Sequence, residues 1–390
     1  MPVTPLPAAP PWLAQRLEQA GGAVPFATYM EWALHDPEHG AYGSGRLQVG
    51  PRGDFATSPS LGPDFAALLA PQLVQWLQEL AEQHPGQPLA LVETGPGEGD
   101  LALQLAEALA ENWPALAART SLVLVEPNPG MAARQRQRLA VCPLPCRWVG
   151  LAELAAAPVQ GVVLAHEVLD ALAVERIVWD GAHWRQQLLE LHQGLLRLVP
   201  GEPLGPQAEA PLTALGLLPA NPQRPPGWTT ELHPGLQPWL QAAAAGLSAG
   251  RMLVIDYAHE AWRYYAPQRA NGTLMAYRGQ QASDDPLQDP GHWDLTAHLC
   301  IESLVAAGDA TGWSLVGQRR QGEALLALGL AQRLHGLQHQ SVGQLADLLS
   351  RREALLRLVD PMALGDFRWL AFSRGPAGAM PLFLQDPSLV

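Results

Sequence analysis

A short apolar run, an acidic residue and three glycines follow one another in the first third of the chain. The run 89–92 leads into Glu93, and Gly95, Gly97 and Gly99 then alternate with other residues. Apolar residues followed by closely spaced glycines are typical of a buried strand, a tight turn and a helix N-terminus. α/β proteins hold nucleotides with this unit, because the glycines let a ligand approach the backbone closely.

The spacing of the glycines separates two classes of ligand. Dinucleotide-binding turns read G-x-G-x-x-G, and the third glycine position of that pattern is Asp100 here. The chain instead reads E-x-G-x-G-x-G, the form found where the ligand is S-adenosylmethionine, which has no pyrophosphate. We therefore expect these turn residues to line an S-adenosylmethionine site: Glu93, Gly95, Pro96, Gly97 and Gly99.

A second acidic residue stands where the next predicted strand ends. Glu126 closes the predicted strand Ser121–Glu126 and lies 31 positions after Gly95 (126 − 95). In nucleotide-binding sheets, a carboxylate at this place accepts hydrogen bonds from both ribose hydroxyls. We therefore expect Glu126 and the adjacent Pro127 to contact the nucleoside, although a lone strand-end Glu is otherwise typical of a solvated edge.

Two carboxylates close the fourth predicted strand, Gly161–Val168. Glu167 and Asp170 are three positions apart across a strand-to-helix turn, and His166 precedes them. Both carboxylates can point into one cleft, where they would match the planar fork of a guanidinium. Helix capping by Asp170 is the structural alternative, and His166 is equally compatible with a structural hydrogen bond.

The fifth predicted strand, Arg251–Tyr257, ends in Asp256 and Tyr257, where a methyl acceptor could lie. A buried Asp that holds a loop by backbone hydrogen bonds is the equal alternative. Four residues are therefore the catalytic candidates: Glu167, Asp170, Asp256 and Tyr257. No histidine or cysteine grouping has the spacing of a metal site, so no metal is predicted.

The loop Gly53–Pro59 reads Gly-Asp-Phe-Ala-Thr-Ser-Pro. Small and hydroxylic residues around one aromatic suit a loop that approaches a ligand. The residues alone favour the alternative, a plain turn in which Ser58 or Ser60 caps a helix over Phe65–Leu80.

Strands and helices alternate through the middle of the chain. This pattern predicts an α/β fold with a doubly wound, mostly parallel sheet whose ligands lie at the carboxyl ends of the strands. The helix Gly130–Ala140 is expected to expose Arg134, Gln135 and Arg138. The remaining elements of the alternation are strands at Leu89–Glu93 and Arg147–Val149 and a helix at Asp100–Glu111.

Two insertions interrupt the alternation. Residues 174–230 combine an antiparallel meander over Val174–Leu198 with a Pro-rich linker, and residues 260–293 are polar enough to predict a structureless lid. Residues 1–88 read as a helical extension, which leaves a core over 89–390. The predicted elements after the lid are helices at Leu295–Ala307, Gly322–Leu334 and Val342–Leu358 and strands at Trp313–Gln318 and Phe367–Phe372.

Composition excludes several functions. The net charge of −13 disfavours sequence-independent binding of nucleic acid. All 24 basic residues are arginine, so neither Schiff-base chemistry nor a Walker A phosphate loop is available. No run approaches the roughly 20 apolar residues that span a bilayer. Because the N-terminus also lacks a signal-peptide pattern, we expect a cytoplasmic protein.

Several separated stretches together resemble one family, the MidA family of class I S-adenosylmethionine-dependent methyltransferases. They are, in order, residues 25–26, 36–42, 53–59, 93–99, 166–172, 256–257, 272–279, 284–290, 294–296, 321–323 and 326–330. The resemblance covers the chain from about residue 25 to its end. It implies the seven-stranded sheet of class I methyltransferases and upgrades Thr57 and Ser58 from a turn to cofactor contacts. Asp54 and His166 are also expected to contact the cofactor.

The resemblance also implies an activity. Mitochondrial members of the family assist respiratory complex I assembly by dimethylating an arginine of a core hydrophilic subunit, so the expected partner is an arginine-bearing respiratory subunit. Two departures bear on the acceptor: Ser60 stands where the family usually has Glu, and His166 where it usually has Asn. A small-molecule acceptor and a cofactor-binding assembly factor without turnover are therefore the alternatives.

Overall fold

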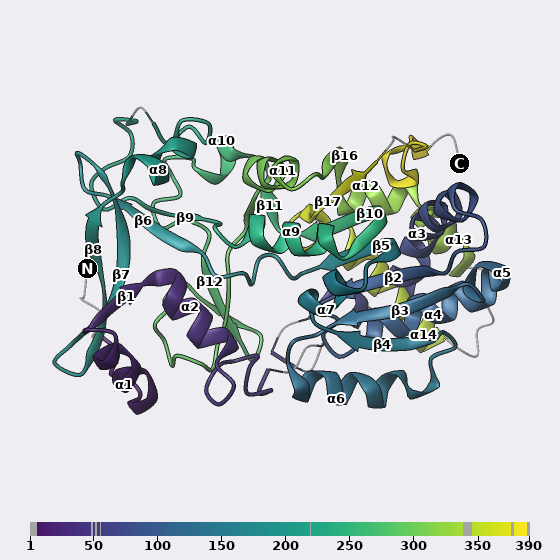
Figure 1. Cartoon of the computed structure of the whole chain (residues 1–390), viewed down its shortest axis with the longest axis horizontal. Helices are drawn as coiled ribbons and strands as arrows, with labels where there is room; N and C mark the ends of the chain where they lie inside the picture. The colour runs from purple at the N-terminus through teal and green to yellow at the C-terminus, as the bar shows by residue number, and fades with distance from the viewer. Residues whose placement is uncertain are drawn as a thin grey trace. The chain divides into compact units, whose positions relative to one another are not determined.

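The computed structural model of the chain describes residues 6–387 except 48–49, 51–52, 55, 219, 338–344 and 376–377. The chain forms two compact units, each built from separate stretches of sequence (Figure 1). The first unit comprises Met1–Gln48, Asp170–Pro238 and Ala258–Ala306, and the second comprises Val49–Leu169, Trp239–Tyr257 and Ala307–Val390.

The second unit contains a seven-stranded sheet with the order β16-β17-β10-β5-β2-β3-β4. Strands β10, β5, β2, β3 and β4 run parallel, and β17 is antiparallel to both of its neighbours. The predicted α/β fold with a mostly parallel sheet is thereby confirmed. The strands are β2 (Leu89–Thr94), β3 (Thr120–Val125), β4 (Cys146–Val149), β5 (Val159–His166), β10 (Leu247–Asp256), β16 (Ser314–Arg320) and β17 (Arg368–Arg374).

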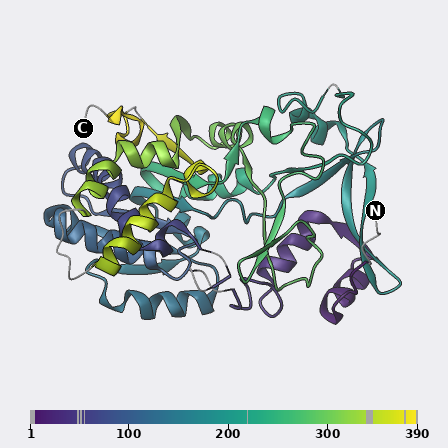
Figure 2. The same cartoon turned by 180° about the vertical axis from the view of Figure 1, so that it is seen from behind.

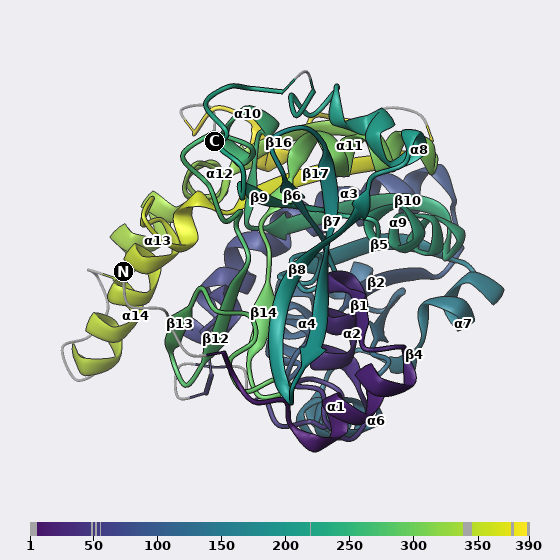
Figure 3. The same cartoon turned by 90° about the vertical axis from the view of Figure 1, so that its left-hand side faces the viewer.

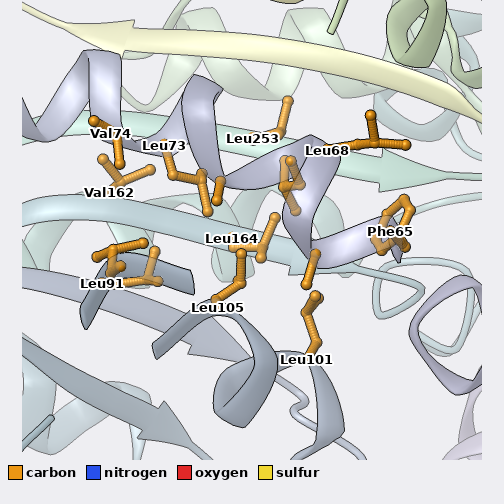
Figure 4. Close-up of a cluster of buried hydrophobic side chains, with 14 of the residues drawn as sticks. Phe65, Leu68, Leu73, Val74, Leu91, Leu101, Leu105, Val162, Leu164 and Leu253 are labelled. Atoms are coloured by element: carbon orange, nitrogen blue, oxygen red, sulfur yellow. The ribbon is translucent and has the colours of Figure 1, made fainter. Parts of the chain in front are cut away.

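Helices of the second unit bury apolar side chains against this sheet. Leucines and aromatics of α3 (Asp64–Gln83) and α4 (Asp100–Asn112) interdigitate with Leu91, Val162 and Leu164 of the central strands (Figure 4). Each fully buried side chain of this size contributes about 1.5–3 kcal/mol. The other helices are α5 (Pro114–Ala117), α6 (Pro129–Arg138), α7 (Leu151–Ala156), α12 (Gln321–Ala327), α13 (Leu330–Leu337) and α14 (Leu345–Leu358).

The same face of the sheet is also covered by the C-terminal helices. Helices α13 and α14 lie in front of the sheet in Figure 2. They share a buried cluster with α3, to which they contribute Leu330, Leu337, Leu355 and Leu358. The predicted helix Val342–Leu358 begins in residues outside the described ones, and α14 is its described part. None of the described helices is long and apolar enough to cross a membrane.

Close strand pairing accounts for one glycine in β5. A Cβ at Gly161 would overlap the backbone carbonyl of Ala90 on β2, so no larger residue fits without separating the two strands. The pairing of β2 with β5 begins at this contact and continues to Thr94 and Ala165, so the carboxyl ends of the two strands are adjacent, and the predicted ligand residues follow those two ends.

The first unit contains a second sheet, with the order β1-β7-β6-β9 and β8 paired to β7. All its strands are antiparallel. The long β7–β8 hairpin is visible in Figure 3, and Gln193 and Gly194 turn it with positive φ angles. The elements are α1 (Pro11–Gln19), β1 (Ala23–Pro25), α2 (Phe26–His35), β6 (Glu175–Trp179), β7 (Trp184–His192), β8 (Leu195–Pro203), α8 (Pro206–Glu209) and β9 (Thr229–Leu232).

The predicted lid is not structureless. Within residues 260–293 the chain forms α10 (Ala261–Tyr264), β12 (Met275–Arg278) and β13 (Gln281–Ser283). Strand β12 pairs with both β13 and β14 (Asp294–Thr296), so Leu295 and Thr296, predicted as the start of a helix, lie in a strand. The next short strand, β15 (Leu299–Cys300), pairs with β11 (Ala258–His259).

The compact units follow different boundaries from the predicted domains. The N-terminal helices α1 and α2 share one buried cluster with β7 and with residues 274–297, because Leu13, Phe26 and Leu189 pack together with Leu274. Residues 1–47 and both insertions therefore belong to one unit. Helices α9 (Leu236–Ala245) and α11 (Ile301–Ala310) each include residues of both units.

Candidate functional site

The glycine turn joins β2 to α4 in the second unit. Gly95, Gly97 and Gly99 have φ angles of 59°, 53° and 85°, a left-handed conformation that favours glycine. The N–H of Gly95 donates to the carbonyl of Val125 at the end of β3 (3.1 Å), and a Cβ at Gly95 would overlap the side chain of Val168 after β5. The turn is thus packed between the ends of the two strands that flank β2.

Glu93, predicted to contact the cofactor, is buried beside this turn with 4% of its surface exposed. Burial, reinforced by the charge of Asp100, raises the pKa of Glu93 to about 8. Its Oε2 atom is buried and has no hydrogen-bond partner among the described residues. A buried acceptor of this kind fits a ligand that brings a hydrogen-bond donor or a positive charge.

Glu126 follows the end of β3 and belongs to a hydrogen-bond network that reaches the glycine turn. Gln135 Nε2 donates both to Glu126 Oε2 (2.9 Å) and to the carbonyl of Gly97 (2.8 Å). The indole N–H of Trp148 donates to Gln135 Oε1 (3.0 Å), which fixes the amide. Glu126 Oε1 accepts from the N–H of Asn128 (2.8 Å), while burial raises the pKa of the carboxyl group.

Gln135 was predicted to be exposed and is fully buried. All residues of helix α6 from 134 to 138 are polar, so hydrophobic periodicity could not show which of them faces the sheet. Arg134 and Arg138 do lie near the surface, where they pair with Glu98 (3.1 Å) and Asp100 (2.6 Å). These half-exposed ion pairs add little stability, and they align α6 with the turn.

The carboxyl end of β5 carries His166 and Glu167. Glu167 has a φ of 53°, which is strained for a residue with a side chain and is characteristic of functional sites. His166 Nε2 lies 3.4 Å from Glu167 Oε1. Because burial lowers the pKa of His166 to about 3, the imidazole is neutral near pH 7 and the contact is not an ion pair.

Asp256 lies at the end of β10, next to β5, and is fully buried. Its Oδ2 accepts from the N–H of Leu169 (3.0 Å), and its Oδ1 accepts from the N–H of Tyr257 (2.8 Å). These bonds stabilise the turn that follows Glu167, which matches the alternative in which Asp256 holds a loop by backbone hydrogen bonds. The ring of Tyr257 packs edge-on against Phe367, with centroids 4.0 Å apart. Catalytic roles for these two residues stay predictions.

The loop predicted to cover the cofactor lies against the end of β5. Thr57 caps a short 3₁₀ turn, Ser58–Leu61, and the N–H of Ser58 donates to Glu167 Oε1 (3.4 Å). Helix α3 begins at Asp64 with Pro63 at its N-cap, so the expectation that Ser58 or Ser60 caps it is wrong. Asp54 is half-buried, and Phe55 lies outside the described residues.

Asp170, the fourth catalytic candidate, begins a segment of the first unit. Its carbonyl accepts from the N–H of Ala297 (3.0 Å). Burial raises the pKa of its carboxyl group to about 7. Burial also raises the pKa of Tyr277, and the charges of Asp170 and Asp294 add to that effect. Among the predicted site residues Asp170 alone lies in the first unit, whereas the others lie in the second.

A parallel sheet, a glycine turn at its carboxyl edge and a strand-end carboxylate on the neighbouring strand together define a nucleoside-binding α/β protein. The carboxylate of Glu93 is buried and that of Glu126 half-buried, and both have raised pKa values, so a ligand with a positive charge would stabilise their ionised forms. S-adenosylmethionine combines a nucleoside with a sulfonium and an ammonium group, and therefore fits these residues.

Comparison with known proteins agrees with this class. Residues 68–319 match a family described as "Putative S-adenosyl-L-methionine-dependent methyltransferase", and the chain belongs to that family. A protein from Burkholderia thailandensis, solved with S-adenosyl-homocysteine bound, superposes with a TM-score of 0.83 at 28% identity, covering 98% of both chains. The protein is thus an S-adenosylmethionine-dependent methyltransferase, and S-adenosylmethionine is its cofactor.

Two relatives have more specific names. A Drosophila melanogaster protein named "Protein arginine methyltransferase NDUFAF7 homolog, mitochondrial" is 28% identical over 92% of this chain and 83% of its own length. A Bos taurus protein named "Protein arginine methyltransferase NDUFAF7, mitochondrial" is 26% identical over 90% of this chain and 80% of its own. The predicted cytoplasmic location is wrong by this comparison, because both relatives are named mitochondrial. The prediction rested on composition, which bears on whether a chain can insert into a membrane and does not identify the compartment.

Proposed function

We propose that this enzyme methylates an arginine side chain of a substrate protein, and that the substrate protein is a subunit of a complex I-type respiratory enzyme. The observation that carries the proposal is Glu167, a carboxylate held in a strained conformation at the end of the strand beside the glycine turn. A carboxylate there matches the donor fork of a guanidinium. The names of the relatives from Drosophila melanogaster and Bos taurus, protein arginine methyltransferases, support the same acceptor.

We assign the cofactor to the carboxyl edge of the sheet in a class I methyltransferase fold with a helical N-terminal extension and two insertions. Gly95, Gly97 and Gly99 let the cofactor approach the backbone, and Glu126 holds its ribose. Glu93 lies beside the glycine turn and receives a donor group of the ligand. The remaining proposed contacts are Asp54, Thr57, Ser58, Pro96, Pro127 and His166.

S-adenosylmethionine supplies a methyl group on a positively charged sulfur. In the transfer the carbon–sulfur bond breaks and leaves its electron pair on sulfur as S-adenosylhomocysteine, a carbon–nitrogen bond forms, and the guanidinium nitrogen releases a proton that passes to solvent. Glu167 orients the guanidinium by accepting hydrogen bonds, and Asp170 is the second proposed carboxylate. Asp256 keeps the turn after Glu167 in place through its bond to the N–H of Leu169 (3.0 Å). Positioning and exclusion of water then account for catalysis.

A small-molecule acceptor is the second candidate. His166 supports it, because its neutral imidazole stands at the strand end where the family that the chain resembles usually has asparagine. An imidazole is bulkier than a carboxamide and offers different hydrogen-bonding atoms, so it can change which acceptor fits.

Labelled methyl transfer tests the proposed acceptor. The protein is incubated with methyl-labelled S-adenosylmethionine and a cell lysate, and modified proteins and metabolites are identified by mass spectrometry. We expect label on an arginine of a protein, and at least tenfold less label with Glu167→Gln. The control Glu111→Gln changes an exposed carboxylate at the end of α4 and should leave transfer unchanged. Label found only on a metabolite would refute the protein acceptor, and cofactor binding without any transfer would favour an assembly factor.

A further inference from the structure

Gln321 is a buried polar residue at the start of α12, outside the predicted site residues. It is fully buried, and its backbone N–H donates to the carbonyl of Phe367 (2.8 Å). The indole N–H of Trp369 on β17 donates to its side-chain oxygen (3.2 Å). The backbone bond holds the start of α12 beside Phe367, and the indole bond fixes the side-chain oxygen of Gln321 against β17.

The amide nitrogen of Gln321 joins two further segments of the second unit. It donates to Ser58 Oγ (3.2 Å) in the loop and to the carbonyl of Leu358 (3.1 Å) at the end of α14. Both amide hydrogens and the amide oxygen therefore have partners. Three distant parts of the sequence meet at this one side chain, so its orientation is strongly determined.

Ser58 continues the connection to the end of β5. Ser58 is fully buried, and its N–H donates to Glu167 Oε1 (3.4 Å). The same turn is held from another side, because Gln104 Nε2 on α4 donates to the carbonyl of Pro59 (3.4 Å). A continuous series of hydrogen bonds thus runs from Trp369 through Gln321 and Ser58 to Glu167.

We propose that Gln321 is a positioning residue for methyl transfer, which holds Ser58 and, through Ser58, the carboxylate of Glu167. The inference rests on the proposed roles of Ser58 at the cofactor and Glu167 at the acceptor. Burying a carboxamide costs desolvation that an apolar residue of similar volume would avoid, and its three bonds offset that cost. The bond to Ser58 is the one that reaches the site.

A double-mutant cycle separates positioning from simple support of the fold. Gln321→Met keeps the volume and removes the side-chain bonds, and Ser58→Ala removes the hydroxyl that accepts from Gln321. We expect each variant to weaken binding of S-adenosylhomocysteine about three- to tenfold, measured by calorimetry, and the double variant to weaken it no further. Gln160→Met is the control, since Gln160 Nε2 donates to Leu80 O (3.2 Å) at the other end of β5.

Hydrogen exchange provides an independent readout. Gln321→Met should speed amide exchange in peptides covering 56–61 and 166–169 and leave residues 159–165 of β5 unchanged. A lower melting temperature with unchanged affinity and unchanged local exchange would overturn the proposal, as would additive effects in the double variant. If Gln321→Met does not fold, unchanged affinity in Ser58→Ala overturns the proposal by itself.

These results are distinguishable from failure of the proposed function. A wild-type protein that binds S-adenosylhomocysteine and methylates no protein would refute the proposed acceptor, while the double-mutant cycle on affinity would still decide the role of Gln321. A wild-type protein that does not bind S-adenosylhomocysteine would overturn both.

Discussion

Glu93 is predicted to lower the stability of the ligand-free protein while it supports ligand binding. Its pKa rises from 4.5 to about 8 on folding, because the carboxyl group is buried and lies near the charge of Asp100. The native state therefore binds this proton more tightly than the unfolded state does. The contribution of Glu93 to the free energy of unfolding is therefore most favourable below about pH 4.5, and it is lost as the pH rises towards 8.

The size of the effect follows from the shift. Between pH 4.5 and pH 7 the unfolded chain ionises Glu93 while the folded protein keeps it protonated, and the resulting cost to folding grows by roughly 1.4 kcal/mol per pH unit, which gives about 3 kcal/mol at pH 7. Glu93→Gln imitates the protonated carboxyl group and removes this cost. For a chain of 390 residues, about 3 kcal/mol corresponds to a melting temperature higher by roughly 4 °C.

Both the effect on stability and the effect on ligand binding can be measured by thermal unfolding of wild type and Glu93→Gln. The measurements run from pH 4.5 to pH 8.5, with and without S-adenosylhomocysteine. Without ligand, we expect the two proteins to coincide at the lowest pH and the variant to be more stable at the highest. With ligand, the variant should gain less stability, because binding is weaker. The exposed Glu111→Gln serves as the control. A variant that is less stable than wild type at pH 8.5, or that gains equal stability from ligand, would refute this account of Glu93.

Two further substitutions test the elements that position the site. Gly161→Ala places a methyl group against the carbonyl of Ala90, so the β2–β5 pair must separate. We expect the free energy of unfolding, measured in urea, to fall by more than about 3 kcal/mol. A small decrease would contradict the tight strand contact. Gln135→Leu leaves its partners at the turn and on β3 unsatisfied, so stability should fall by about 1–3 kcal/mol and affinity for S-adenosylhomocysteine should fall in calorimetry. The exposed neighbour Gln137→Leu should change neither, and equal effects of the two would exclude a specific role for Gln135.

The local patterns predicted much of the second unit. Alternation of strands and helices placed β2, α4, β3 and β5 within two residues of their observed ends. The glycine spacing favoured an S-adenosylmethionine turn over a dinucleotide turn, and the positive φ angles of Gly95, Gly97 and Gly99 account for glycine at these three positions. Such features are local in sequence, so a single chain is sufficient to recognise them.

Features that depend on distant partners escaped prediction. Gln321 is 263 residues from Ser58 and 48 from Trp369, and nothing near it in the sequence marks it as buried. The segment 260–293 looked too polar for a folded element, yet Leu274, Ala276 and Leu287 supply a few buried contacts between polar turns. Short strands with few apolar residues give too little periodicity to be recognised.

Binding of S-adenosylhomocysteine to wild type and Gly97→Val, measured by calorimetry, tests the central claim most directly. Gly97 has a φ of 53°, which a β-branched residue does not tolerate, so valine should distort the turn and abolish binding. Gly86→Val is the matched control, since Gly86 has a φ of 79° outside the turn, where a Cβ meets no other atom within 4 Å. We predict binding by wild type and the control and none by Gly97→Val. Tight binding by Gly97→Val would contradict the assignment of the glycine turn as the cofactor site.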